Sequence, residues 1–225
     1  MTTLLVTGAN RGIGFQIASS GIELGWTVYG SVRTQQQAAE LEATLPGIHI
    51  MVLDVCDRKA IEKAASSFAE PLDVLINNAG IIGPDKQSPL EMDFDGFERT
   101  LAVNTLAPLA VAQAFLPALK QSAHGRILTI SSQMAWMGYA KSDRIAYRAS
   151  KAAVNKVMQG LATDLEAEGI AVGVIDPGWV RTDMGGASAE NDAEDVAKGI
   201  LALADRFAMK DSGKFFKWSG EERPY

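Results

Sequence analysis

The sequence predicts a three-layer α/β fold, in which about seven parallel strands form one doubly wound sheet with helices on both faces. Two observations carry this prediction. Short apolar segments alternate with amphipathic segments along the whole chain, and a glycine-rich turn directly follows the first apolar segment. No linker, internal repeat or low-complexity segment interrupts the alternation, so residues 1–225 are expected to form a single domain.

Turn residues and caps divide the first half of the chain into elements. Gly25 ends the first helix, Pro46 and Gly47 end the second, and Asp57 is a typical N-cap for the third. In order, we expect strand 3–7, a helix continuing to Leu24, strand 27–32, helix 35–45, strand 48–53, a helix from Asp57 to Phe68 and strand 72–76.

The second half repeats the pattern after a loop at 81–92. A long helix is expected at 95–119, where Pro108 would produce a kink and free a main-chain carbonyl near Asn104. The remaining expected elements are strand 126–131, helix 145–166, strand 170–175, a helix from Asp192 or Ala193 through Leu203, a short strand at 214–218 and a charged tail at 221–225.

Composition excludes several classes of protein. The 225 residues are 47% hydrophobic, which suits one domain with a sizeable core, and the net charge of −6 argues against nucleic-acid binding. Cys56 is the only cysteine and is interpreted as a small buried side chain in a reducing compartment. The chain start has no signal-peptide pattern and no segment predicts a membrane span, so a cytoplasmic protein without a membrane partner is expected.

The glycine-rich turn is the first functional motif. It reads Thr7-Gly8-Ala9-Asn10-Arg11-Gly12-Ile13-Gly14, with the spacing G-x-x-x-G-x-G. Glycines allow the backbone to approach a ligand, and the N–H groups at the start of the next helix attract a pyrophosphate. A plain strand-to-helix turn is the alternative. Placement between a strand and a helix favours a Rossmann-type nucleotide site.

Tyr147 and Lys151 form the second motif. Four residues apart on a predicted helix, they share one face. A lysine ammonium favours the phenolate, so it would lower the tyrosine pKa from about 10 and make the phenol an acid or base near neutral pH. An ordinary solvated pair is the alternative. Ser132, at the end of the preceding strand, would lie at the same sheet edge, where ligands of open α/β sheets bind.

Taken together, the motifs resemble the short-chain dehydrogenase/reductase family over nearly the whole chain. They comprise the glycine turn, an acid after the third strand, Asn-Asn-Ala-Gly at 77–80, Ser-Ser at 131–132, Tyr-x-x-x-Lys and Pro177-Gly178. The stretch 147–151 and the tail segment 213–216 look most like the carbonyl-reductase branch, which includes sniffer-type reductases and bacterial C-factor signalling proteins. The segment after Asp183 is shorter than in many members, so the substrate stays open.

The resemblance implies a catalytic set of Asn104, Ser132, Tyr147 and Lys151. Tyr147 would be the acid/base, Ser132 would hold the substrate oxygen, Lys151 would hold the ribose hydroxyls, and Asn104 would hold a water linking Lys151 to solvent. The implied cofactor-binding residues are Gly8, Asn10, Arg11, Gly12, Ile13, Gly14, Arg33, Asp54, Val55, Asn78, Ala79, Gly80, Tyr147, Lys151, Pro177, Gly178, Val180 and Thr182.

The end of the second strand predicts NADP (NADPH) as the cofactor. Val32 stands where an acid would hold the ribose hydroxyl of NAD, and Arg33 follows it. Arg11, in the glycine turn, would reach the same phosphate, and Ser31 or Thr34 would add a hydroxyl. Solvated surface charges are the alternative for both arginines.

The sequence therefore predicts NADPH-dependent reduction of a small carbonyl compound, an aldehyde, ketone or quinone. The alternative is a nucleotide-binding signalling or regulatory protein with little turnover. A hydrolase is disfavoured because no G-x-S-x-G elbow is present, and no cluster of metal ligands is found. A homodimer or homotetramer through helices 95–119 and 145–166 is expected. The expected substrate walls are Trp136, Met137, Trp179 and Met184, with Ile81 and Ile82.

Overall fold

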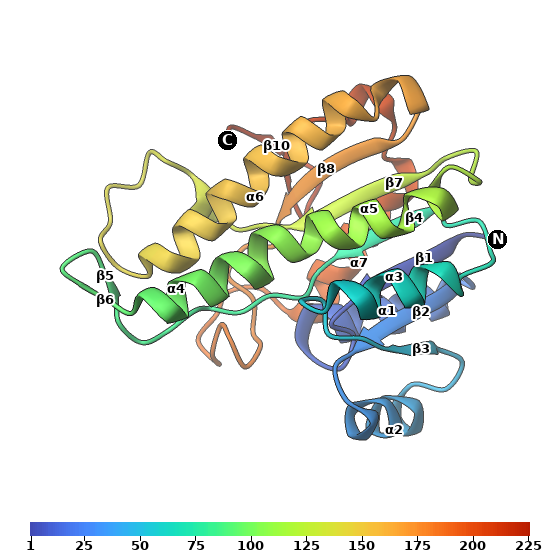
Figure 1. Ribbon diagram of the computed structural model, residues 1–225, viewed down its shortest axis with the longest axis horizontal. Helices are drawn as coiled ribbons and strands as arrows, with labels where there is room; N and C mark the ends of the chain where they lie inside the picture. Colours follow the sequence, from blue (N-terminus) through green and yellow to red (C-terminus); the bar gives the residue numbers. More distant parts are fainter.

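The computed structural model describes residues 1–225 and contains one eight-stranded sheet of order β10-β9-β8-β7-β4-β1-β2-β3 (Figure 1). Seven strands run parallel, and only β10 is antiparallel to its neighbour. The predicted single-domain, parallel α/β fold is confirmed. The strands are β1 (Thr3–Thr7), β2 (Thr27–Val32), β3 (His49–Val52), β4 (Val74–Asn77), β7 (Arg126–Ile130), β8 (Ala171–Asp176), β9 (Phe215–Lys217) and β10 (Glu222–Arg223).

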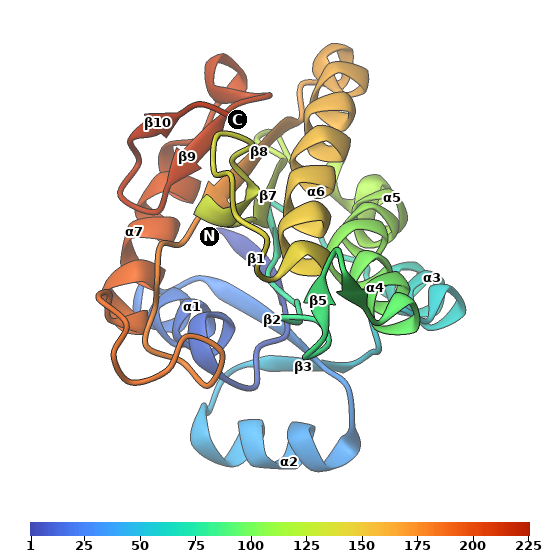
Figure 2. The same ribbon diagram turned by 90° about the vertical axis from the view of Figure 1, so that its left-hand side faces the viewer.

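Helices cover both faces of the sheet, as Figure 2 shows in a view along the layers. On one face lie α1 (Gly12–Glu23), α2 (Gln35–Thr44) and α7 (Ala193–Arg206), and on the other lie α3 (Arg58–Ser66), α4 (Phe94–Leu101), α5 (Ala107–Leu119) and α6 (Ile145–Asp164). Each face has its own hydrophobic cluster. In β1, Leu4 and Val6 face the first cluster while Leu5 faces the second, because successive side chains of a strand point to opposite faces.

The long helix at the centre of one face is continuous but not regular. A π-helical turn at Ala102–Leu106 joins α4 to α5, and Pro108 stands in the first turn of α5. A π-helical turn before Pro108 thus takes the place of the kink that was expected at that proline. Such turns are frequent at functional sites. By length and composition alone Phe94–Leu119 could cross a membrane, yet half of its most apolar window is buried inside the fold. It is a core helix.

Two segments contain more structure than the sequence indicated. The expected loop at 81–92 holds a small hairpin of β5 (Gln87–Ser88) and β6 (Glu91–Met92). The expected charged tail forms β10, and the Tyr225 hydroxyl donates to the Gly213 carbonyl at 2.6 Å. The sequence did not predict the hairpin or β10, because two-residue strands are too short to produce a periodic pattern. Short 3-10 turns lie at Gln133–Ala135, Glu166–Glu168 and Met209–Asp211.

Candidate active site

The carboxyl ends of the central strands open onto one cavity of about 590 Å³. Its lining includes the glycine turn after β1, Ser132 after β7 and Tyr147 on α6. The sheet order reverses between β1 and β4, and a crevice forms at such a point because the adjoining loops turn to opposite faces. The topology thus brings together the motifs that the sequence placed at separate strand ends.

Ser132 and Tyr147 meet directly. The Ser132 side chain faces the Tyr147 hydroxyl and acts to lower its pKa, and the Ser132 hydroxyl accepts from the Met134 N–H at 3.1 Å. Ser131 is turned the other way, since its hydroxyl donates to the Asn155 Oδ1 at 2.5 Å inside the protein. Ser132 is therefore the serine that faces Tyr147, and its catalytic role stays a prediction.

Lys151 lies beneath this pair and is buried. Its Nζ donates to the Ile130 carbonyl at 2.8 Å and lies 5.8 Å from the centre of the Tyr147 ring. No carboxylate pairs with it, so burial lowers the pKa of Lys151 to about 8. Even this buried ammonium therefore holds its proton at neutral pH.

The pKa of Tyr147 differs from the expectation. Burial raises the pKa of this phenol, while the hydrogen bond from Ser132 and the charge of Arg144 act in the opposite direction. The predicted lowering is wrong for the chain alone, because loss of solvation outweighs the effects of Ser132 and Arg144, and the charge of Asp176 adds to the rise. Tyr147 consequently keeps its proton at neutral pH, which is the form that a proton donor needs.

Asn104 anchors the loop after β4 through its side chain, and its implied role in holding a water stays a prediction. It lies buried in the π-helical turn and does not line the cavity. Its Nδ2 donates to the Ile81 carbonyl (2.8 Å) and to the Ser150 hydroxyl (3.0 Å), and its Oδ1 accepts from the Ile81 N–H (2.9 Å). The side chain thus fixes the loop after β4 against α6.

The glycine turn contributes two glycines of positive φ to the cavity. Gly8 (φ 71°) and Gly12 (φ 55°) line the cavity in the left-handed backbone region that glycine tolerates best. Gly14 lies behind the cavity lining, within the same turn. A Cβ there would lie 2.2 Å from the Gly8 carbonyl oxygen and 2.4 Å from the Asn78 Nδ2, so this glycine allows the turn to close from behind.

Asn78 and Ala79 fasten the turn to the neighbouring strand. Both of their N–H groups donate to the Thr7 hydroxyl at 3.0 Å, and the Asn78 Nδ2 donates to the Thr7 carbonyl at 2.9 Å. The other predicted cofactor residues that line the cavity are Asn10, Arg11, Ile13, Arg33, Asp54, Val55, Gly80, Pro177, Gly178, Val180 and Thr182, together with Tyr147 and Lys151.

The two arginines at the cofactor end are differently placed. Arg33 lines the cavity without an ion-pair partner, whereas Arg11 pairs with Asp183 at 3.1 Å on the surface. The hydroxyls of Ser31 and Thr34 both accept backbone hydrogen bonds, from the glycine turn and from the start of α2. Arg33 is therefore the guanidinium most available to a ribose phosphate.

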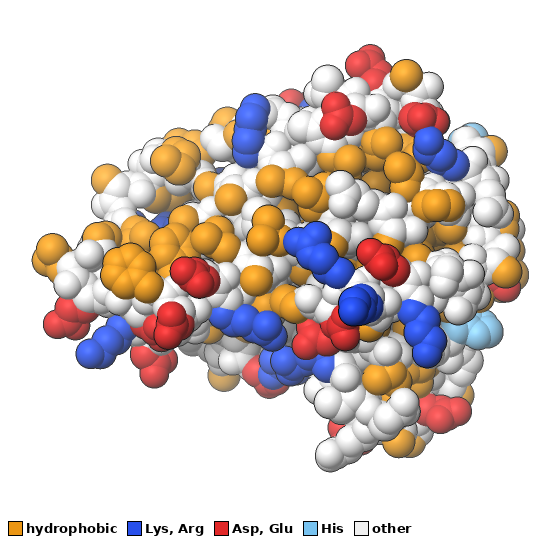
Figure 3. All heavy atoms as spheres, in the orientation of Figure 1, with side chains coloured by type: hydrophobic (Ala, Val, Ile, Leu, Met, Phe, Trp, Pro, Cys, Tyr) orange, Lys and Arg blue, Asp and Glu red, His pale blue; other side chains and the backbone are white.

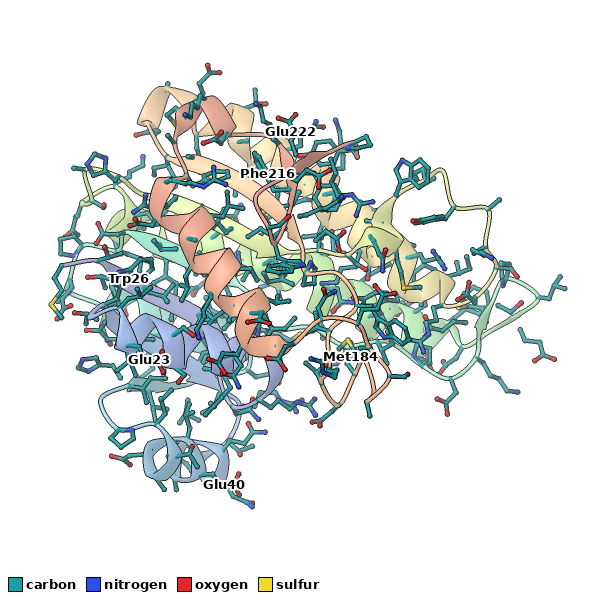
Figure 4. The ribbon with its side chains drawn as sticks, turned by 180° about the vertical axis from the view of Figure 1, so that it is seen from behind. Glu23, Trp26, Glu40, Met184, Phe216 and Glu222 are labelled. Atoms are coloured by element: carbon teal, nitrogen blue, oxygen red, sulfur yellow. The ribbon has the colours of Figure 1, made fainter.

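Two of the expected substrate walls do not line the cavity. Met137 is 84% exposed, and Trp136 packs edge-on against Tyr139 with ring centres 4.8 Å apart. Met134, two residues after Ser132, takes their place in the lining. Its spacing from Ser132 could have indicated this position. Figure 4 shows Met184 on the loop between β8 and α7. The apolar walls are Ile81, Ile82, Met134, Trp179 and Met184.

Asp176, at the end of β8, is a buried acid for which the sequence predicted no role. Its Oδ1 accepts from the N–H groups of Gln133 and Gly178, each at 2.9 Å, and its Oδ2 pairs with Arg223 on β10. One carboxylate thus joins the loop after Ser132, the Pro-Gly turn and the C-terminal strand.

Gln87 is a second residue that sequence reasoning missed. Its Oε1 accepts from the Tyr147 N–H at 3.0 Å, and its Nε2 donates to the carbonyls of Ile82 (3.0 Å) and Pro84 (2.6 Å). The β5–β6 hairpin therefore holds the first turn of α6 in place through one buried amide.

Known proteins resemble this chain in sequence and in fold. Residues 2–193 match the protein family described as short chain dehydrogenase. A Myxococcus xanthus protein named C-signal is 41% identical over 157 residues, which are 69% of this chain and 93% of that protein. The NADPH-bound carbonyl reductase from chicken fatty liver has a TM-score of 0.90 at 30% identity, with 100% of this chain and 99% of that one covered. The carbonyl reductase Sniffer of D. melanogaster has a TM-score of 0.93 at 29% identity, with both chains fully covered.

Proposed function

This chain belongs to the short-chain dehydrogenase family, and we propose that it reduces an aldehyde, ketone or quinone to the alcohol with NADPH. The observation that carries the proposal is the meeting of Ser132, Tyr147 and Lys151 in the same cavity as the glycine turn. A protein that only binds a nucleotide has no need of a buried tyrosine that a serine and a lysine flank. The carbonyl reductases among its structural neighbours support the same reaction class.

In this mechanism the chain supplies the proton and orients the carbonyl group of the substrate. When bound, NADPH supplies the hydride that reduces the carbonyl carbon. Tyr147 donates its hydroxyl proton to the carbonyl oxygen, and Ser132 donates a hydrogen bond to that oxygen. The Lys151 ammonium stabilises the tyrosinate that remains, and solvent then returns the proton. The products are the alcohol and NADP⁺.

The buried ammonium leads to a pH prediction. We expect kcat/KM for reduction to be level near neutral pH and to fall as pH rises through about 8, where Lys151 loses its proton. The pH profile of kcat/KM measures this. Lys151→Arg is the control, because a guanidinium stays protonated, so the remaining activity should show no decline near that pH. An identical decline in this variant would assign the titration to another group.

Cofactor preference depends on Arg33. Because a charge-assisted hydrogen bond contributes about 1.5–3 kcal/mol and about 1.4 kcal/mol is tenfold, kcat/KM should favour NADPH over NADH by about tenfold or more. Arg33→Ala should weaken NADPH binding and leave NADH binding nearly unchanged, as fluorescence titration would measure. Arg11→Ala is the comparison, and its effect should be smaller because Arg11 is already paired with Asp183. Equal efficiency with both cofactors in the natural chain would contradict the assignment.

A second candidate is a signalling protein that binds nucleotide and turns over little. The 41% identity to the protein named C-signal favours it. Oxidation of NADPH, followed by absorbance with a panel of aldehydes, ketones and quinones, distinguishes the two. Tight NADPH binding without turnover of any carbonyl would support the second candidate.

The expected homodimer or homotetramer stays a prediction, as does the cytoplasmic location. Leu90 (95% exposed) lies in the turn of the β5–β6 hairpin, and Phe94 (72% exposed) is the first residue of α4. Figure 3 shows hydrophobic side chains gathered on the surface in this region. A contact between subunits would cover them. Light scattering of the purified protein would test the assembly.

A further inference from the structure

Arg144 has an unusual backbone. With φ 51° and ψ 41°, it is the one residue other than glycine that has a positive φ. A left-handed conformation costs an ordinary residue roughly 1–2 kcal/mol. Such strain persists where the surrounding structure enforces it, and it is concentrated at functional sites. Arg144 stands directly before α6, three residues before Tyr147.

Capping of α6 does not explain an arginine at this position. The Arg144 side chain makes no hydrogen bond to the helix start, where serine, threonine, aspartate and asparagine are the effective residues. The Tyr147 N–H in the first turn is already bonded to Gln87. Glycine or asparagine would also adopt the left-handed backbone at lower cost.

No acid in the structure pairs with Arg144. The adjacent Asp143 is held by Arg148, whose Nη2 donates to its carboxylate at 3.0 Å and whose Nε donates to its carbonyl at 2.8 Å. Arg144 is absent from every ion pair that the chain forms. A guanidinium is thus exposed at the rim of the cavity with its charge uncompensated.

The Arg144 guanidinium lies in a defined part of the cavity. Arg144 lines the same cavity as Ser132, Tyr147 and the apolar wall formed by Met134 and Met184. Arg144 lies directly before α6 and three residues before Tyr147, which places it at the substrate end and not beside Arg33 at the cofactor end. The substrate end therefore combines a proton donor, an apolar wall and one unpaired cation.

We propose that Arg144 binds a carboxylate on the carbonyl substrate, so that the preferred substrates are aldehyde or keto acids with an apolar body. A guanidinium and a carboxylate form two parallel hydrogen bonds, which fix the direction of the substrate as well as its affinity. This inference rests on the proposed function and specifies its substrate class.

A matched pair of aldehydes tests the inference. In the full-length protein with NADPH, 4-formylbenzoate should have a higher kcat/KM than methyl 4-formylbenzoate, which lacks the charge. Arg144→Gln should reduce the acid-to-ester ratio of kcat/KM by about tenfold or more, mainly through KM, and Arg144→Lys should restore part of it. Lys141→Gln is the control, because it removes the same charge from the same loop outside the cavity lining.

Binding without turnover gives an independent measurement. Benzoate alone should raise the Tm of the natural protein and of Lys141→Gln, and should leave the Tm of Arg144→Gln unchanged. An acid-to-ester ratio that Arg144→Gln does not change would overturn the inference. If neither aldehyde is reduced, the panel of aldehydes, ketones and quinones decides the proposed function. The benzoate measurement then decides the role of Arg144 by itself, since a Tm shift that depends on Arg144 supports it and the absence of one refutes it.

Discussion

Replacing Tyr147 by phenylalanine is expected to lower kcat/KM for carbonyl reduction by at least about 10²-fold, since general acid catalysis contributes roughly 10²–10⁴-fold. The substitution removes the hydroxyl that Ser132 holds and leaves the buried ring in place. The fold and the glycine turn should therefore be unaffected. Initial rates of NADPH oxidation with a reducible carbonyl measure the effect.

The control for this variant is Tyr139→Phe. Tyr139 belongs to the same loop region, packs against Trp136 and does not line the cavity, so its hydroxyl should be dispensable. NADPH should bind both variants with the affinity of the natural protein, as titration would show. Near-normal turnover by Tyr147→Phe would refute the assignment of the proton donor.

Arg223→Met is expected to reduce the free energy of unfolding by about 3–5 kcal/mol, the cost of leaving one member of a buried ion pair alone. The side chains of Arg223 and Asp176 are only 13% and 5% exposed, and the aliphatic part of Met keeps much of the packing over Phe215. Unfolding in urea, followed by circular dichroism, measures the change.

A double variant separates charge from packing. Asp176→Asn combined with Arg223→Met should recover most of the lost stability, because the amide oxygen of asparagine can still accept from the Gln133 and Gly178 N–H groups without an unpaired charge. Lys217→Met breaks the exposed pair with Glu221 and should cost at most about 1 kcal/mol. If Arg223→Met cost no more than Lys217→Met, the tail would not be anchored as the structure indicates.

The expectations that the structure contradicts have a common physical origin. Trp136 and Met137 looked like cavity walls because they are large and close in sequence to Ser132, but the direction of a loop side chain depends on what packs against it. The pKa of Tyr147 was expected to fall because a lysine lies one turn away. Burial of the phenol, which no local pattern reveals, raises it instead.

The sequence by itself determined the parallel α/β fold, the glycine turn and the convergence of Ser132, Tyr147 and Lys151. These features follow from local periodicity and from the rule that strand ends share one edge of the sheet. Only the tertiary structure decided that Asp176 pairs with Arg223 and that Gln87 holds the start of α6. The tertiary structure also showed that Arg144 has no ion-pair partner. Such contacts join residues far apart in the chain, and their strength depends on burial, which exists only once the chain has folded.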